Sequence, residues 1–422
     1  MGLNTRVAAL AIDGGQPVRS APLPPRMMID SRETAAVDAL MRRVTTEGGS
    51  FDRYDGPEVD QLEADLAEYF GVKYVTAVSS GTAAVQSALG ALDLDPGSEV
   101  ITSSMTDPGA VMPLFFMGLI PVFVDHDVDT MLMSPEAIEA AITKRTGAII
   151  ATHLYGFICD MDTIQRIARA HGIPVIGDAS QAHAGKYHGS LSAPFGDIGA
   201  VSTMAWKHMT TGGQGGFVAT DREDLYWAAK RFADRGKPFN QDASSNTGMG
   251  LNYRMTELAA VVGRVQLRKL SDVADRRRAI YDALCAGVAE TRTMHAATLL
   301  PDTTPTPYVI PFAVDVDALG VTNEYFAQAV TAEGIPATPG DRHLIYTKEF
   351  MLRKKSFGST FFPFGYALPT HVTDWTVPAN PGVAELARTV ILLSPHEDWK
   401  ESEISDTIEA FKKVESSIGA DR

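Results

Sequence analysis

The sequence predicts an α/β protein in which helices cover both faces of a mostly parallel sheet, with a smaller C-terminal α+β domain after it. Between residues 74 and 220, short runs of apolar and β-branched residues alternate with helical stretches. Strands that are apolar throughout are typical of a parallel sheet buried on both faces. After about residue 300 the pattern changes, because Val309–Val314 alternates like a half-buried strand.

The length of the chain favours more than one domain. Its 422 residues exceed one average domain. We therefore expect an N-terminal arm over residues 1–30, a large domain over residues 31–290 and a small domain over residues 291–422.

The composition argues against several classes of partner. A net charge of −15 speaks against nucleic acid, because phosphate binding requires a basic surface. No apolar run reaches the roughly 18 residues that a membrane span needs. The N-terminus has no cleavable apolar core, and Cys159 and Cys285 are expected to be buried thiols in a reducing compartment. These features predict a cytoplasmic protein, and no metal site is expected.

The first half of the chain begins with two predicted helices. Ser31 is expected to cap the first, which runs to about residue 43, and Pro57 opens the second, which ends at Gly71. Strands and helices then alternate. We predict strands over residues 74–78, 100–102, 121–124, 147–153 and 174–178, and helices from residue 81 and over residues 108–118, 134–143 and 162–171.

The second half begins with an apolar strand over residues 198–201 and a return strand over residues 217–220. The pattern is then helical to about residue 286, with a polar interruption over residues 240–250. Further helices are predicted over residues 322–333 and 402–417, and the aromatic- and glycine-rich residues 357–369 are expected to form a long loop.

A lysine stands between the predicted strands over residues 198–201 and 217–220. Lys207 follows the first strand, and the glycine-dense turn Thr210–Gly216 comes directly after it. A lysine held between a strand end and glycines can reach a bound carbonyl group without blocking its approach. Schiff-base chemistry needs this geometry and a lysine whose pKa is lowered by its surroundings. A lone lysine is more often a surface residue, so the prediction depends on its neighbours.

A second motif is typical of anion binding. At Ser80-Gly81-Thr82 a strand turns through glycine into an alanine-rich helix. The free N–H groups and the dipole of such a helix start attract a phosphate. The alternative is a capped helix whose small residues only allow close packing.

Four elements in a fixed order together suit pyridoxal phosphate: the Ser80 motif, Asp178 with Gln181, Ser202 with Lys207, and the glycine turn. The helix start would bind the phosphate, and Asp178 would keep the pyridine nitrogen protonated, so that the ring acts as an electron sink. Lys207 would bind the cofactor and then move a proton. Asp178 alone would be read as a structural carboxylate, but the order of the set favours a catalytic role.

These motifs resemble the DegT/DnrJ/EryC1/StrS sugar aminotransferases, which are fold-type-I pyridoxal-phosphate enzymes. The resemblance extends from about Ala11 to Phe411. It is carried by the segments 14–19, 80–84, 177–183, 196–207 and 251–258, which read GGQPVR, SGTAA, GDASQAH, GDIGAVSTMAWK and LNYRMTEL.

The resemblance implies a role for each matching residue. Lys207 would be the Schiff-base lysine, Asp178 the partner of the ring nitrogen and Gln181 a neighbour of the ring hydroxyl. The phosphate would be held by Ser80, Gly81, Thr82 and Ser202. Asn252 would reach the phosphate of the neighbouring subunit, so a homodimer with shared active sites is expected.

Three further residues are candidates for substrate binding. Arg254 would hold the carboxylate of the amino donor through its bidentate fork, unless it is a surface helix arginine. His343 and Tyr346 match a family position that faces the substrate, and the alternative for the histidine is a loop residue without a role.

One stretch departs from the family pattern. Residues 104–109, Ser-Met-Thr-Asp-Pro-Gly, lack the aromatic residue that in relatives stacks on the cofactor ring. Either another side chain covers the ring or Asp107 contacts the substrate; as a third possibility, Asp107 only caps the next helix. The glycine turn also reads Gly-Gly-Gln-Gly-Gly where most members have Gly-Glu-Gly-Gly.

The sequence therefore predicts a pyridoxal-phosphate aminotransferase that moves an amino group from glutamate or glutamine to a keto-sugar or keto-cyclitol. Two alternatives remain open. One is elimination or ring aromatisation on a sugar-like ketone with the same cofactor. The other is a degenerate binding or regulatory homologue, against which the retention of Lys207 and Asp178 counts.

Overall fold

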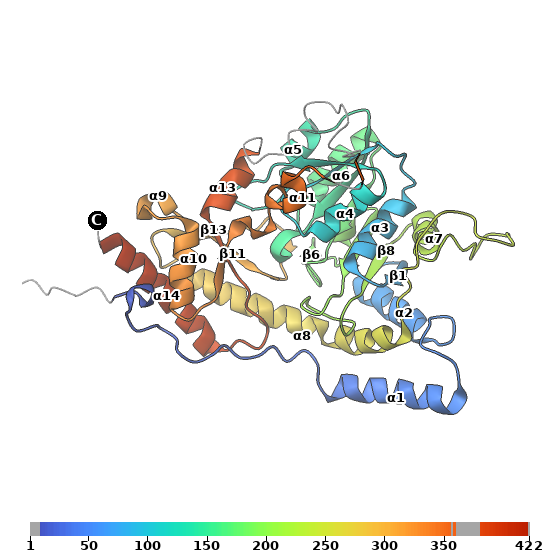
Figure 1. Cartoon of the computed structure of the whole chain (residues 1–422), viewed down its shortest axis with the longest axis horizontal. Coiled ribbons are helices and arrows are strands. Elements are labelled where there is room, and N and C mark those ends of the chain that lie inside the picture. The colour runs from blue at the N-terminus through green and yellow to red at the C-terminus, as the bar shows by residue number, and fades with distance from the viewer. Residues whose placement is uncertain (1–8, 356–357, 360–379, 421–422) are drawn as a thin grey trace, which may run out of the picture.

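The computed structural model describes residues 9–355, 358–359 and 380–420 (Figure 1). Apart from Gly358 and Ser359, the predicted loop over residues 357–369 lies outside the described residues.

Within the described residues, seven strands form the large sheet in the order β1-β8-β7-β5-β4-β2-β3. Strand β8 runs antiparallel to both of its neighbours, and the other neighbouring strands are parallel. The expectation of a mostly parallel sheet is confirmed. Because no helix connects β7 to β8, the chain returns in the opposite direction. The strands are β1 Tyr74–Val78, β2 Glu99–Ser103, β3 Ile120–Val124, β4 Thr146–Thr152, β5 Val175–Asp178, β7 Ile198–Ser202 and β8 Gly216–Thr220.

Helices cover both faces of this sheet, as predicted. Val218 of β8 packs in one apolar cluster with residues of α3 and α7, whereas its neighbours Phe217 and Ala219 pack in another with residues of α2 and α8. Since successive strand residues point to opposite faces, the two clusters lie on opposite sides of the sheet. The helices of this part are α2 Glu58–Phe70, α3 Gly81–Ala91, α4 Pro108–Phe116, α5 Pro135–Ala140, α6 Met161–His171, α7 Glu223–Phe232 and α8 Glu257–Val288.

Two predicted helix starts are shifted by one or two residues. Asp30, not Ser31, is the N-cap of α1 (Ser31–Glu47), where it forms a capping box with Glu33. Asp160, not Asp162, caps α6. In both cases an aspartate one or two residues upstream offers a carboxylate oxygen to the free N–H groups of the first turn.

A smaller antiparallel sheet follows α8 in the order β12-β13-β11-β9 within the described residues. Its strands are β9 Met294–Ala296, β11 Ile310–Val314, β12 Ala337–Pro339 and β13 Val390–Leu393, and the accompanying helices are α9 Val316–Leu319, α10 Asn323–Ala332, α11 Glu349–Leu352, α13 Pro381–Thr389 and α14 Glu401–Ala420. The predicted domain boundary at residue 290 falls between α8 and β9. The division into domains stays a prediction.

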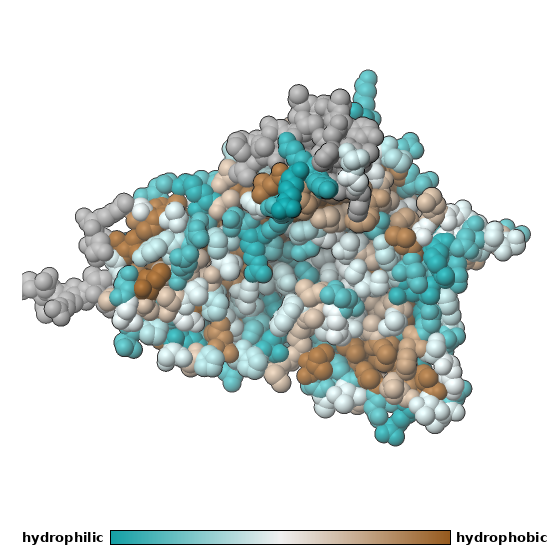
Figure 2. Space-filling view, in the orientation of Figure 1, coloured by the Kyte–Doolittle hydropathy of each residue, from teal (hydrophilic) through white to brown (hydrophobic). Residues whose placement is uncertain are grey.

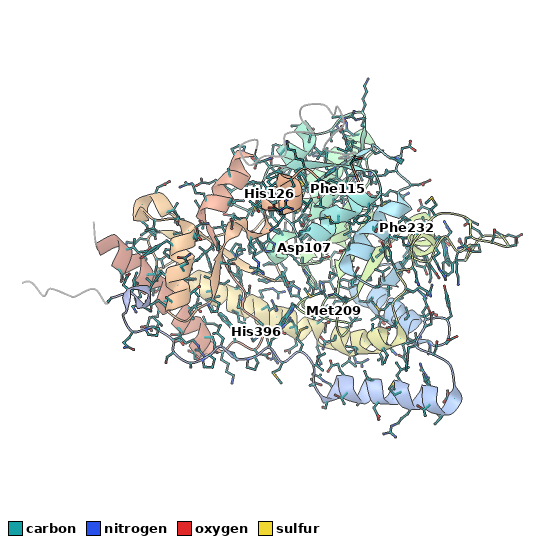
Figure 3. The ribbon with its side chains drawn as sticks, in the orientation of Figure 1. Asp107, Phe115, His126, Met209, Phe232 and His396 are labelled. Carbon is teal, nitrogen blue, oxygen red and sulfur yellow. The ribbon has the colours of Figure 1, made fainter. Side chains whose placement is uncertain are left out.

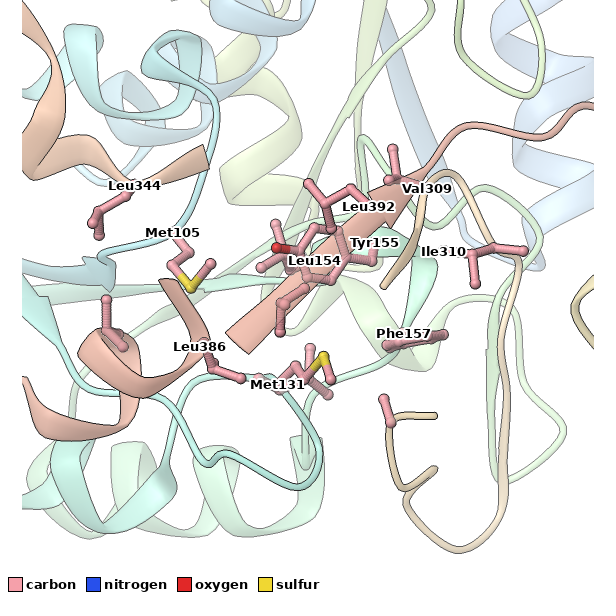
Figure 4. Packing of buried hydrophobic residues seen from close by; sticks show 14 of the residues in the cluster. Met105, Met131, Leu154, Tyr155, Phe157, Val309, Ile310, Leu344, Leu386 and Leu392 are labelled. Atoms are coloured by element: carbon pink, nitrogen blue, oxygen red, sulfur yellow. The ribbon is translucent and has the colours of Figure 1, made fainter. Parts of the chain in front are cut away.

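The two sheets share one apolar cluster. Met105 and Tyr155, from the large-sheet part, pack in it with Ile310, Leu344 and Leu392 from the small-sheet part (Figure 4). A common core of this kind fixes the small sheet against the carboxyl ends of the large-sheet strands. After a 3-10 turn at Ala11–Asp13, the N-terminal arm runs in extended form along the outside of both parts and leads into α1 (Figure 1).

Candidate active site

A cavity of about 970 Å³ opens at the carboxyl ends of the parallel strands, where ligands bind in open α/β sheets. Figure 3 shows Asp107 and His396, which both line it, in the middle of the molecule. The structure brings most of the predicted site residues to this cavity: Ser80, Gly81, Thr82, Asp107, Asp178, Gln181, Ser202, Lys207 and His343.

The start of α3 forms a cradle. Ser80 is the N-cap of this helix, and its hydroxyl accepts a hydrogen bond from the Ala83 N–H at 3.0 Å. A Cβ atom on Gly81 would lie 2.5 Å from the Cβ of Ser202, so only glycine lets the helix start approach the end of β7 so closely. Thr82 also lines the cavity. Backbone N–H groups and three hydroxyls around a helix start form a site that fits a phosphate group.

Lys207 is nearly completely buried in the wall of the cavity. Burial lowers the pKa of its ammonium group to about 8, although the charges of Asp178 and Asp107 oppose the shift. The Nζ atom lies 4.1 Å from the centre of the Tyr308 ring, over its face. A lysine with this pKa has a substantial free-base fraction near neutral pH and can act as a nucleophile.

Asp178 lies at the end of β5, in the same cavity as Lys207. One carboxylate oxygen accepts a hydrogen bond from the Ser180 N–H at 3.0 Å. Burial raises the pKa of Asp178, while the hydrogen bonds from Ser180 and the charge of Lys207 oppose the shift. The neighbouring hydroxyl of Thr152 is buried without a hydrogen-bond partner among the described residues. A buried carboxylate of this kind is stabilised by a cationic partner, and the protonated nitrogen of a pyridine ring fits that requirement.

Gln181 is held by a strained loop. Its side-chain oxygen accepts a hydrogen bond from the Tyr155 N–H at 2.9 Å. Tyr155 has a φ of +61°, a left-handed conformation that is unusual for a tyrosine. The Tyr155 carbonyl oxygen in turn accepts a hydrogen bond from the Tyr308 N–H at 2.8 Å. Gln181 and Tyr308 are distant in the sequence, but both are hydrogen-bonded to the backbone of Tyr155.

Asp107 has the predicted capping role, and its position leaves the predicted substrate contact open. It is the N-cap of α4 and accepts a hydrogen bond from the Gly109 N–H at 2.8 Å, and it also lines the cavity as an exposed carboxylate. The Thr106 N–H donates to the His343 carbonyl oxygen at 2.9 Å, so the two segments meet at the cavity. Burial lowers the pKa of His343 to about 4, which makes its ring neutral at pH 7.

Three predicted site residues are not among the described residues that line the cavity: Asn252, Arg254 and Tyr346. Arg254 forms ion pairs with Asp52 at 3.1 Å and with Asp234 at 2.8 Å. Asn252 lies in a backbone bridge with Asp234. Tyr346 is buried, and its hydroxyl accepts a hydrogen bond from the Asn380 side chain. Within its own chain, none of the three reaches the cavity.

Several cavity residues were missed from the sequence, namely Arg26, Trp206, Arg277, Tyr308, Arg342 and His396. Trp206 carried a signal in the sequence, because it is a large aromatic residue directly before Lys207. In the structure 65% of its surface is exposed. Tyr308 follows the proline-rich run Pro305-Thr306-Pro307, which carries no such signal.

The comparisons with known proteins agree with this geometry. A model of the DegT/DnrJ/EryC1/StrS aminotransferase family matches residues 29–360. The chain belongs to this family. It is 38% identical over 227 residues to the GDP-perosamine synthase of Escherichia coli O157:H7, a match that covers 54% of this chain and 62% of that protein. The chain thus spans about three fifths of the length of this curated relative.

Two further relatives cover more of this family member. The spore coat polysaccharide biosynthesis protein SpsC of Bacillus subtilis is 31% identical over 316 residues, which cover 72% of this chain and 81% of that protein. The X-ray structure of the aminotransferase from Psychrobacter cryohalolentis superimposes with a TM-score of 0.82 at 29% identity and covers 94% of this chain and 100% of that chain. The expected fold of the pyridoxal-phosphate aminotransferases is confirmed.

The described residues contain neither a membrane-spanning helix nor a metal-binding cluster. No helix in that part of the chain is long and apolar enough to cross a membrane. In the same residues, no group of three or more His, Cys, Asp or Glu side chains could hold a metal ion.

Proposed function

We propose that the protein is a pyridoxal-phosphate-dependent aminotransferase. The observation that carries the proposal is that Lys207, with its lowered pKa, shares one cavity with the buried carboxylate of Asp178 and with the start of α3. A nucleophilic amine, a partner for a ring nitrogen and a phosphate cradle are the three features that this cofactor requires.

Each part of the cavity would serve one task. Bound pyridoxal phosphate supplies an electron sink for the α-carbon of an amino acid. Ser80, Gly81, Thr82 and Ser202 would hold the phosphate. Asp178 would hold a proton at the ring nitrogen. Lys207, with a pKa of about 8, can take up and release a proton at Nζ near neutral pH, as transamination requires.

The acceptor is proposed to be a keto-sugar or keto-cyclitol, and the donor glutamate or glutamine. The names of the Escherichia coli and Bacillus subtilis relatives, which point to perosamine and to a polysaccharide, support a sugar. A cavity of about 970 Å³ lies near the upper end of the range for small-molecule sites and offers room for an acceptor beside the cofactor. Asp107 and His343 are proposed to face this acceptor.

A homodimer with shared active sites is part of the proposal. Asn252 and Arg254 do not reach the cavity of their own chain, so they would act in that of a partner. Figure 2 shows apolar residues gathered near α1, and Met27 and Met41 are exposed on this arm and helix. An exposed apolar patch of this kind supports burial against a second subunit. We place the enzyme in the cytoplasm, which its two free cysteines support.

The function is tested by incubating the protein with pyridoxal phosphate, glutamate or glutamine, and a panel of keto-sugars, with and without an attached nucleotide. Mass spectrometry should show an amino-sugar and the 2-keto acid in equal amounts. The Lys207→Ala variant should form neither. An unsaturated or aromatic product would indicate elimination instead, and binding of pyridoxal phosphate without turnover of any ketone would favour a regulatory homologue.

A further inference from the structure

The N-terminal arm reaches the cavity at Arg26. The side chain of Arg26 is only 5% exposed. Its Nη1 donates to the carbonyl oxygen of Trp206 at 2.8 Å, and its Nη2 donates to the carbonyl oxygen of Lys207 at 2.8 Å. Because both donors belong to one planar guanidinium group, they fix the position and the rotation of the backbone that carries the lysine.

Glu397 connects Arg26 to a second buried arginine. One oxygen of Glu397 accepts from Nε of Arg26 at 2.8 Å, and the other accepts from Nε of Arg277 at 3.0 Å. Nη1 of Arg277 donates to the carbonyl oxygens of Pro307 and Tyr308 at 3.1 and 3.2 Å. One carboxylate thus holds the two arginines that fix the backbones of Lys207 and Tyr308, whose side chains meet in the cavity.

The electrostatics of this Arg26–Glu397–Arg277 cluster favour a rigid arrangement. Burial acts to raise the pKa of Glu397, but the charges of Arg277 and Arg26 outweigh it, so the pKa lies below its usual value. The carboxylate is therefore ionised at neutral pH. Removing one member of a buried charge cluster leaves the others without compensation, which is costly. The N–H groups that the cluster donates to backbone carbonyl oxygens all bind residues 206–207 or 307–308.

We propose that Arg26 is a positioning residue for Lys207, so that the N-terminal arm is a working part of the active site. The inference rests on the proposed function. Arg26 acts through the two carbonyl groups and not on the reacting atoms. A lysine side chain has four rotatable bonds, so its amine is placed only as well as the backbone from which it starts. A misplacement of about 1 Å can cost roughly a hundredfold in rate.

The chain offers a matched control for this test. Arg19 lies on the same arm, is 9% exposed at its side chain, and pairs with Glu403 at 2.9 Å and Asp406 at 2.7 Å. It is not among the described residues that line the cavity. Arg19→Met should therefore loosen the arm and lower stability without disturbing Lys207. Arg26→Met should lower stability and also disturb Lys207.

The experiment compares the holoenzymes of Arg26→Met, Arg26→Lys and Arg19→Met with the wild type. We expect both Arg26 variants to lower kcat about tenfold or more, with KM for donor and acceptor changed less than about threefold. Arg19→Met should keep kcat within about twofold at a similar loss of thermal stability. Arg26→Lys keeps a positive charge without the two-pronged donor, so it tests the geometry even if Arg26→Met does not fold.

A second readout is independent of turnover. The protein is stripped of pyridoxal phosphate, and the reaction of Lys207 with trinitrobenzenesulfonate is followed by peptide mapping. In the Arg26 variants only, the rate of this reaction should fall, or the pH midpoint of the rate should shift. If no ketone is a substrate but this difference appears, the proposed function fails, whereas the positioning of Lys207 by Arg26 stands. Equal effects of the Arg19 and Arg26 variants, or wild-type behaviour of Arg26→Met, would overturn the inference.

Discussion

The two sides of the cavity are built in different ways. The side formed by the large sheet consists of short motifs at strand ends, such as Ser80–Thr82 after β1 and Asp178 at the end of β5. The opposite side is assembled from Arg26 on the arm, Tyr308 before β11 and His396 after β13. The first side carries the groups expected to act on the cofactor. The second side fixes the backbone of Lys207 through Arg26, and it depends on contacts between residues that are more than a hundred positions apart.

The largest expected effect on the large-sheet side comes from replacing Asp178. Asp178→Asn removes the charge that would face the ring nitrogen and should lower kcat/KM roughly a hundredfold, because a hydrogen bond to a charged group is worth about 1.5–3 kcal/mol. Steady-state kinetics with glutamate checks this. Asp160→Asn is the control, because Asp160 caps α6 outside the cavity lining of the described residues and asparagine caps equally well. Equal losses in both variants would contradict the role of Asp178.

The pH dependence of cofactor capture tests the burial of Lys207 between the two sides of the cavity. With a pKa of about 8, the free-base fraction should rise roughly fiftyfold between pH 6 and pH 8. The rate at which cofactor-free protein captures pyridoxal phosphate should rise with it and level off above pH 8. Stopped-flow absorbance measures this rate, and a midpoint near the ordinary lysine value of 10.5 would show that the lysine is not buried as described.

The same shift makes a prediction for stability. In the unfolded chain the lysine keeps its proton up to its ordinary pKa, whereas in the folded protein it loses the proton near pH 8. The unfolded state therefore binds more protons between these values, so the stability contribution of Lys207 is unfavourable below pH 8 and improves as the pH rises. Lys207→Met should be more stable than wild type at pH 7, with an advantage that shrinks towards pH 10. Urea denaturation at both pH values checks the sign.

Asp107 separates a structural from a substrate role. Asp107→Ala should lower the free energy of unfolding by about 1 kcal/mol, because α4 loses its N-cap, whereas Asp107→Asn should retain it. If the carboxylate also faces the acceptor, Asp107→Asn should slow the acceptor half-reaction roughly tenfold and spare the donor half-reaction. Equal slowing of both half-reactions would point to an effect on the cofactor instead.

Tyr308 gives the smallest expected effect. Its ring face stabilises the charged form of Lys207, an interaction worth up to about 1–2 kcal/mol when desolvated. Tyr308→Leu should therefore lower the pKa of Lys207 by about one unit, while Tyr308→Phe keeps the ring face and should leave the pKa nearly unchanged. The capture midpoint described above measures both. A shift of the same size in the phenylalanine variant would assign the effect to the hydroxyl group.

The difference between the two sides also explains what the sequence could predict. Periodicity and turn residues located the strands, and a ligand site of a parallel sheet lies where those strands end. The common location of Ser80, Asp178 and Lys207 at one cavity could therefore be predicted. The antiparallel course of β8 was expected only as a return strand, since its partner β1 is more than a hundred residues away.

The other side could not be predicted for a physical reason. Arg26 and Glu397 are 371 residues apart and meet only through tertiary packing, and no spacing in the sequence marks that contact. Tyr346 illustrates the reverse case: it shares a segment with His343, but its ring packs against Phe123 in the core instead of reaching the cavity. His343 and Tyr346 lie in two successive 3-10 turns, Gly340–His343 and Ile345–Thr347, yet only His343 lines the cavity.

The central claim is that Lys207 is the residue that binds the cofactor. Protein incubated with pyridoxal phosphate should be reduced with borohydride, digested and mapped by mass spectrometry. The pyridoxyl mass should appear on the peptide that contains Lys207, at one group per chain, and labelling should be absent in Lys207→Ala although that variant folds. A pyridoxyl group on another lysine, or no label on Lys207 in folded wild-type protein, would contradict the claim.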